Sequence, residues 1–205
     1  MNTPKPNLLK PVIQILIFSA LIRGGTAASN SSPPPDSNTQ PQQATQQSAP
    51  TAGSEYLDKP LPIKFTAMDG REVDLAAMKG KVVLINFWNS ESGPCGFETP
   101  ILNDLYKKSH DAGLEIVGIN LDKDKSKVEQ FIKEQQLSWP QYFDGKGSDN
   151  QFAKQFGIQS LPTLWLIDKD GTLLDINARQ SLVAKVKLLM AREKPLSPEE
   201  KKDFR

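Results

Sequence analysis

Hydrophobic positions gather into short runs separated by amphipathic stretches in the second half of the chain. Residues 82–87 form a short apolar run, bounded by Gly80 and by the polar, turn-forming residues 89–93. Residues 114–121 form a second, largely apolar run. Such runs are typical of strands that are buried on both faces of a sheet. We therefore expect two buried strands in the centre of the fold.

Two Asp-Gly pairs predict tight turns between strands. Met68-Asp69-Gly70 separates residues 63–67 from 71–73, near the start of the expected domain. Lys169-Asp170-Gly171 separates residues 163–168 from 172–176. Asp-Gly between two apolar-alternating segments is a strong hairpin signal, because both residues tolerate positive φ. The chain should therefore contain an N-terminal and a C-terminal β-hairpin.

Helical periodicity fills the remaining parts of this region. The expected helices cover residues 96–110, a stretch opened by a Ser126-Lys-Val-Glu129 capping box, residues 151–156 and residues 181–190. Strands that alternate with helices and end in a hairpin and a helix indicate an α/β sandwich with a central mixed sheet.

The N-terminal residues 1–28 have the three parts of a secretory signal. Lys5 and Lys10 provide positive charge, residues 12–22 are mostly apolar, and small residues occupy 24–28. The apolar run is short for a membrane span, which needs about 20 residues. We expect a signal peptide that is cleaved after Ala27 or Ala28, with an uncleaved membrane anchor as the alternative. Either case predicts an extracytoplasmic protein, periplasmic or secreted.

The segments on either side of the domain have a different composition. Residues 29–54 consist mostly of Pro, Gln, Ser and Thr, which cannot bury enough apolar surface to offset the entropy of folding. We expect a disordered linker there, a folded domain over residues 55–190, and a charged, frayed tail over residues 191–205.

Charge and cysteine content exclude several functions. Lys and Arg total 25 against 24 Asp and Glu, so no basic surplus points to nucleic acid. The chain has one cysteine and one histidine, which excludes an internal disulfide and a cysteine-rich metal site. We expect a monomer with no metal and no cofactor.

Candidate chemistry lies where the first buried strand leads into a helix. Ser92 has the position of an N-cap, and Pro94 falls in the first turn, where a missing N–H has little cost. Cys95 lies in the same turn, where the positive end of the helix dipole favours a thiolate.

This segment resembles the active-site segment of thioredoxin-like proteins, especially the exported thiol–disulfide oxidoreductases of the TlpA/ResA type. That family has Asn-Phe-Trp-Ala-x-Trp-Cys-Gly-Pro-Cys followed by a proline. The matching residues here are Asn86, Phe87, Trp88, Gly93, Pro94, Cys95 and Pro100, with Glu98 at a common acidic position. Two departures bear on the chemistry: Ser92 replaces the attacking cysteine, and Glu91 replaces the preceding tryptophan.

A second segment is similar to the same family. Residues 156–163, Phe-Gly-Ile-Gln-Ser-Leu-Pro-Thr, resemble the stretch that carries a cis-proline beside the active site. The resemblance implies a thioredoxin-like fold with an N-terminal β-hairpin extension. It also implies a cis peptide between Leu161 and Pro162 facing Cys95, and active-site walls formed by Trp88, Glu91, Gly93 and Pro94.

The missing cysteine changes the expected chemistry. Dithiol exchange needs one thiolate to attack and a second thiol to resolve the mixed disulfide. Ser92 is a weak nucleophile without an adjacent base, and the only histidine lies at the far end of the helix, which argues against a serine-hydrolase function. We interpret Ser92 as an N-cap, which stabilises the helix by about 1 kcal/mol.

Three functions remain open. The first is a thioredoxin-like protein impaired in dithiol exchange, which binds a protein or peptide client or uses Cys95 as a single thiol, with an external thiol as co-reactant. The second is a monothiol peroxidase, since Ser92-x-x-Cys95 resembles the Thr/Ser-x-x-Cys of peroxiredoxins. The third is a purely non-catalytic peptide-binding module. Cys95 is either packed and unreactive or a reactive thiol.

Overall fold

The computed structural model describes residues 51–205. The predicted leader and most of the predicted linker, residues 1–50, lie outside the described residues. None of the helices in residues 51–205 combines the length and apolar character that a membrane span requires.

A five-stranded mixed sheet forms the centre of the domain, in the order β5-β4-β3-β6-β7. Its strands are β3 (Val82–Trp88), β4 (Leu114–Asn120), β5 (Gln141–Tyr142), β6 (Thr163–Ile167) and β7 (Leu173–Asp175). β3 pairs in parallel with β4 and antiparallel with β6, so it is hydrogen-bonded on both edges. All seven residues of β3 and all seven of β4 are buried, as their apolar runs predict.

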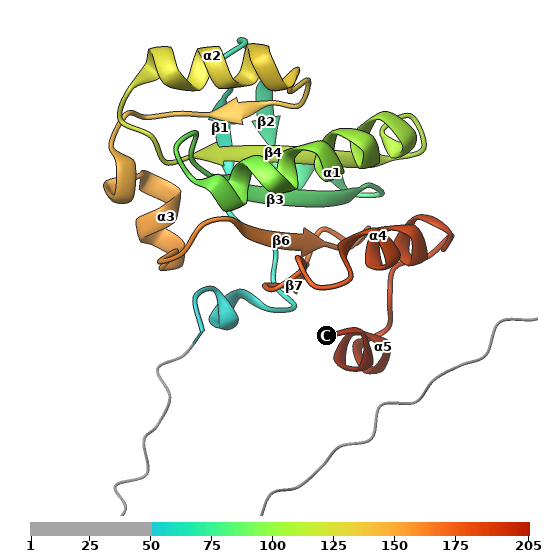
Figure 1. Ribbon diagram of the computed structural model, residues 1–205. Coiled ribbons are helices and arrows are strands. Elements are labelled where there is room, and N and C mark those ends of the chain that lie inside the picture. The colour runs from blue at the N-terminus through green and yellow to red at the C-terminus, as the bar shows by residue number, and fades with distance from the viewer. Residues whose placement is uncertain (1–50) are drawn as a thin grey trace, which may run out of the picture. The chain divides into compact units, whose positions relative to one another are not determined.

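Helices and a hairpin cover the two faces of this sheet. On one face, α1 (Gly93–Ser109) and α4 (Leu182–Met190) pack against the even-numbered residues of β3, such as Leu84. On the other face lie α3 (Gln151–Phe156) and the hairpin of β1 (Lys64–Thr66) and β2 (Glu72–Asp74). Figure 1 shows α1 and α4 in front of the sheet and the hairpin behind it. The predicted α/β architecture with an N-terminal hairpin extension is therefore confirmed.

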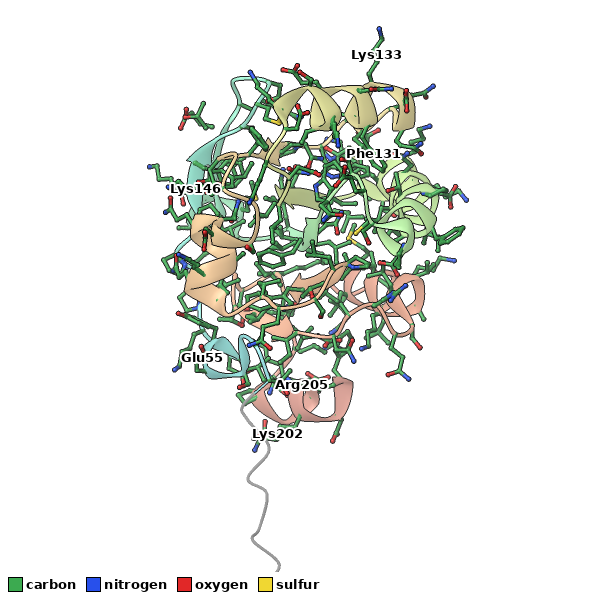
Figure 2. All side chains as sticks on the ribbon, turned by 60° about the vertical axis from the view of Figure 1, so that its left-hand side comes forward. Glu55, Phe131, Lys133, Lys146, Lys202 and Arg205 are labelled. Carbon is green, nitrogen blue, oxygen red and sulfur yellow. The ribbon has the colours of Figure 1, made fainter. Side chains whose placement is uncertain are left out.

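α2 (Lys125–Gln135) lies beside β5 and illustrates an amphipathic surface helix. Figure 2 shows Phe131 pointing into the domain and Lys133 pointing away from it. The helix begins earlier than predicted: Asp124 is its N-cap and accepts from the backbone N–H of Ser126 at 2.9 Å. The proposed Ser126 capping box is therefore wrong, because an equally good capping residue precedes it.

The predicted linker extends too far toward the domain. Ser54–Tyr56 forms a short 3₁₀ helix, η1, that follows Gly53 in a left-handed conformation (φ 80°). Gly53 lies directly against the indole of Trp165, since a Cβ at this position would come within 2.2 Å of that ring. The last residues assigned to the linker are thus part of the folded unit.

The prediction of a frayed C-terminal tail is also wrong. α5 (Pro198–Phe204) begins with a full capping box, in which Ser197 and Glu200 each accept from the other's backbone N–H. Upstream of it, the buried Asp168 carboxylate accepts from the Leu196 N–H at 2.7 Å. The sequence Ser197-Pro198-Glu199-Glu200 is itself a helix-start signal. The prediction of a frayed tail gave more weight to the high charge of the segment than to this signal.

Lys201 fixes α5 to the turn between β6 and β7. It is only 6% exposed, and its Nζ donates to Asp170 Oδ2 at 2.5 Å and to Thr172 Oγ1 at 2.7 Å. Burial alone would raise the pKa of the Asp170 carboxyl, but hydrogen bonds from Lys201 and Thr172 outweigh it and hold that pKa below its ordinary value of 3.8.

Lys201→Ala should therefore destabilise the domain by about 2 kcal/mol, because it leaves a partly buried carboxylate without its cation. Lys202→Ala is the matched control, since Lys202 points away from the domain (Figure 2) and should change the unfolding free energy little. Urea unfolding measures the unfolding free energy of both variants.

The ion pair also predicts a pH dependence. Because the pKa of Asp170 is lower in the folded than in the unfolded state, its ionised carboxylate stabilises the protein above the ordinary pKa of 3.8. The difference between wild type and Lys201→Ala should therefore shrink as the pH falls below that value, and a difference that grows in acid would contradict the ion pair.

Candidate functional site

The site begins where β3 ends and a four-residue turn leads into α1. Asn89 Oδ1 accepts from the Ser92 N–H at 2.8 Å. The Asp122 carboxylate, which follows β4, accepts from the backbone N–H of Ser90 at 2.8 Å and from its hydroxyl at 2.9 Å. These bonds fix both ends of the turn, so the first helical residues are held in one place.

Ser92 caps the helix, as the sequence predicts. Its Oγ accepts from the backbone N–H of Cys95 at 3.4 Å, and Pro94 lies in the first turn. Gly93 and Pro94 are exposed and form the outer surface of this helix start. The Ser92 hydroxyl, which stands where the thioredoxin-like pattern has its first cysteine, is therefore hydrogen-bonded to the backbone of α1.

Cys95 lies on the inner side of the same turn. It is 3% exposed and packs in a small cluster with Trp88 and Val128. Its carbonyl accepts from Thr99 Oγ1 at 2.9 Å, one turn further along α1. Cys95 is the only cysteine of the chain and its thiol is free. This burial agrees with the packed alternative, and the reactivity of the thiol remains a prediction.

The second predicted segment comes to the same place. The peptide bond between Leu161 and Pro162 is cis. Thr163 is opposite Phe87 in the antiparallel β3–β6 pair, so Pro162 lies beside the C-terminal end of β3. Leu161 packs against the cluster that contains Cys95 and Trp88. The strand register thus brings together residues that are more than 60 positions apart in the chain.

Trp88 belongs to the supporting structure of the site. It is 2% exposed, its Nε1 donates to Gln141 Oε1 at 2.9 Å, and its ring centroid lies 5.0 Å from that of Phe131. Gln141 reaches under the indole only because residue 118 is glycine: a Cβ there would lie 1.8 Å from Gln141 Oε1. Sequence reasoning missed Gln141, since nothing local links it to a residue 53 positions away.

Two ion pairs flank the helix start. Glu91 is exposed and pairs with Lys127 of α2, and this hydrogen bond raises the pKa of the Lys127 ammonium. Glu98 Oε1 accepts from Nε of Arg179 at 2.5 Å, while Glu98 Oε2 is buried and has no hydrogen-bond partner within residues 51–205. Arg179 was not expected at the site. It follows β7, and no sequence signal connects it to α1.

The geometry is that of a thioredoxin-like domain, and solved structures agree. A thiol-disulfide oxidoreductase from Bacteroides fragilis is 30% identical and superimposes with a TM-score of 0.58, covering 64% of this chain and 99% of that one. The thioredoxin domain of a thiol-disulfide oxidoreductase from Bacteroides vulgatus is 27% identical, with a TM-score of 0.51 over 61% of this chain and 86% of that one.

Sequence comparison identifies the family. The family model described as Redoxin matches residues 44–187. The thiol-disulfide oxidoreductase ResA of Geobacillus thermodenitrificans is 34% identical over 132 residues, 64% of this chain and 72% of that protein. ResA of Bacillus thuringiensis is 37% identical over 109 residues, but the match spans only 61% of its length and 53% of this chain. The chain belongs to the redoxin family, and its domain is of the TlpA/ResA type of thiol–disulfide oxidoreductase.

The burial of Cys95 predicts slow thiol labelling. If the first turn of α1 must open at a cost of about 2.8 kcal/mol, the folded protein should react with a disulfide reagent roughly 100-fold more slowly than the unfolded chain. Val128→Ala removes a fully buried neighbour of the thiol and should accelerate labelling, whereas Val183→Ala on the exposed side of α4 should not. Equal labelling rates in the folded and the unfolded protein would show that the thiol is accessible.

Proposed function

We propose that the protein is an exported, thioredoxin-like client-binding protein that has lost dithiol exchange. One observation carries this proposal: the attacking position is Ser92, whose hydroxyl caps α1, while the only thiol of the chain is the buried Cys95. Without a second thiol, a mixed disulfide formed at Cys95 has no internal group to resolve it. The N-terminal leader pattern of residues 1–28 supports export to an extracytoplasmic location.

The client is a protein or peptide in an extended conformation. The backbone around Leu161 and Pro162 lies beside the buried thiol, at the end of a strand, and such a position suits strand addition by a peptide. In this proposal main-chain hydrogen bonds hold the client, and Gly93 and Pro94 form the opposite wall of the groove.

Two peptide probes distinguish non-covalent client binding from monothiol chemistry at Cys95. S-carboxymethylated insulin B chain cannot form a disulfide, whereas intact insulin can. We expect the full chain to bind the blocked peptide, and Cys95→Ser to bind it with a dissociation constant within about twofold of wild type, since a serine adds no new charge. The wild-type chain should not accelerate insulin reduction by a small thiol above the uncatalysed rate.

Two other results would contradict the proposed client-binding function, and each would assign a different activity. Retention of intact insulin alone, lost in Cys95→Ser and released by reductant, would assign monothiol exchange to Cys95. Consumption of hydrogen peroxide that depends on Cys95 would instead favour the peroxidase alternative.

Ser92→Cys should restore a redox-active pair. The two-residue spacing at a helix start allows Cα atoms within about 7 Å, which a disulfide requires, and the helix dipole lowers the pKa of the new outer thiol. Adding Glu91→Trp should raise the activity further, because it removes an acidic neighbour and frees Lys127. Insulin reduction and thiol titration after mild oxidation measure both effects.

Ser90→Cys is the matched control, because Ser90 lies before the helix in the turn held by Asp122. It should give no intramolecular disulfide with Cys95. If Ser92→Cys also gives none, the helix start does not have the geometry of a dithiol site.

A further inference from the structure

A cavity of about 680 Å³ is lined in part by Pro162 and does not include Ser92 or Cys95. We call it the Trp165 cavity. Its walls come from three parts of the chain that are distant in sequence: Gly53 at the start of the described residues, Ser160 and Pro162, and Asn177 and Arg179 after β7. Its size is in the range of sites that bind small ligands or peptide segments.

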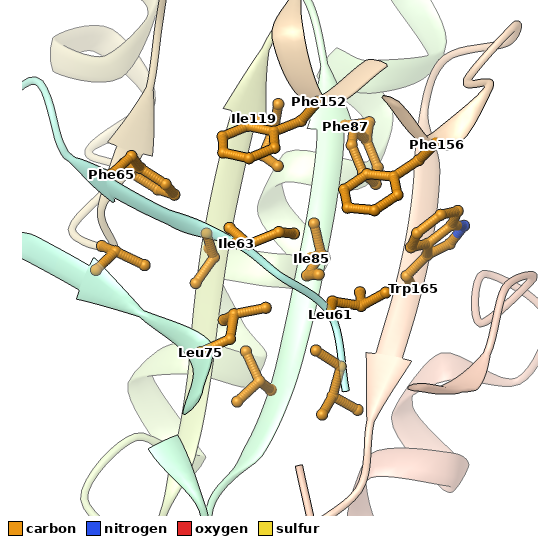
Figure 3. Close-up of a cluster of buried hydrophobic side chains, with 14 of the residues drawn as sticks. Leu61, Ile63, Phe65, Leu75, Ile85, Phe87, Ile119, Phe152, Phe156 and Trp165 are labelled. Atoms are coloured by element: carbon orange, nitrogen blue, oxygen red, sulfur yellow. The ribbon is translucent and has the colours of Figure 1, made fainter. Parts of the chain in front are cut away.

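Trp165 forms the inner wall of this cavity and has an unused donor. The residue is fully buried, and its Nε1 has no hydrogen-bond partner within the described part of the chain. Figure 3 shows the indole nitrogen on the side of the ring that faces away from the apolar cluster. A buried N–H without an acceptor costs free energy, and the Gly53 backbone lies against the ring. An acceptor supplied by a ligand would therefore be favourable once that backbone moves aside.

The Trp165 cavity shares a wall with the proposed client groove. Pro162 borders both, and Arg179 connects the cavity to α1 through its ion pair with Glu98. Glu55 also lines the cavity, so the positive charge of Arg179 is offset by an acidic neighbour. This balance favours a neutral ligand with carbonyl acceptors over a free carboxylate or phosphate.

We propose that the extended client segment that crosses Leu161 and Pro162 continues into the Trp165 cavity. There its main-chain carbonyl groups accept hydrogen bonds from Arg179, and from the Trp165 indole when the Gly53 backbone that lies against the ring moves aside. The cavity is then a specificity subsite for the residues of the client that follow the cis-proline contact. This inference rests on the proposed client-binding function, but it makes a separate claim about where the bound peptide ends.

The test follows the indole N–H signals of the full chain by ¹⁵N–¹H NMR. Trp165→Phe assigns the signal of Trp165, and the probe is S-carboxymethylated insulin B chain. We expect the probe to shift the Trp165 signal and to leave that of Trp139 in place, since Trp139 packs in a different cluster. Trp139→Phe assigns this internal reference.

A plugging variant tests whether the cavity contributes to affinity. Asn177 is exposed and lines the cavity, so Asn177→Phe should fill its mouth and weaken binding of the probe by about tenfold. Gln180→Phe is the matched control: Gln180 is also exposed and lies three residues along, but it does not border the cavity. Its dissociation constant should stay within about twofold of wild type.

Each other outcome overturns the inference in a recognisable way. Binding of the probe with an unshifted Trp165 signal, or undiminished binding by Asn177→Phe, would mean that the peptide ends at Pro162, and the proposed function would survive. A Trp165 shift caused by acetate alone would assign the cavity to small anions. Absence of probe binding to the wild-type chain would overturn the inference and the proposed function together.

Discussion

The whole arrangement depends on the complete burial of β3. All seven of its residues are shielded from solvent, and both of its edges are hydrogen-bonded, to β4 in parallel and to β6 antiparallel. A strand in that position cannot shift by one residue, since every side chain would change faces and leave its cluster. The point where β3 ends is therefore fixed. This end point also fixes the positions of Ser92, Cys95 and Pro162, because a four-residue turn joins β3 to α1 and Phe87 is in register with Thr163.

Serine at position 92 preserves the start of α1, and in the proposed function it also removes the attacking group. Its hydroxyl accepts from the Cys95 N–H, and serine is among the strongest N-capping residues. The turn before it is held by Asn89 and Asp122, whose bonds go to the backbone of residues 92 and 90, so they do not depend on a thiol. The loss of an attacking group thus carries no evident penalty for the fold. In the proposed function, the client groove at Leu161 and Pro162 therefore persists without dithiol exchange.

Local signals made much of this structure predictable. The apolar run of β3, the two Asp-Gly turns and the Ser92 cap each act within a few residues, and each was located from the sequence. What escaped prediction depends on distant partners. β5 has only two residues and no periodicity, and it is defined by its pairing with β4. The Trp88–Gln141 bond spans 53 positions and the Lys201–Asp170 pair spans 31, so charge or polarity alone gave no indication of burial.

The two ends of the described chain close the free edge of the sheet. Residues 57–60 pair with β7: the Asp58 N–H donates to the Leu173 carbonyl, and the Leu173 N–H donates to the Lys59 carbonyl. Arg205 then binds the Asp58 carboxylate and the Leu174 carbonyl. Covering an exposed edge in this way prevents pairing with another chain. Because η1 and Gly53 directly precede the paired segment, the C-terminal helix also helps to hold the outer wall of the Trp165 cavity. The stability of α5 and the shape of the proposed client subsite are thereby physically coupled.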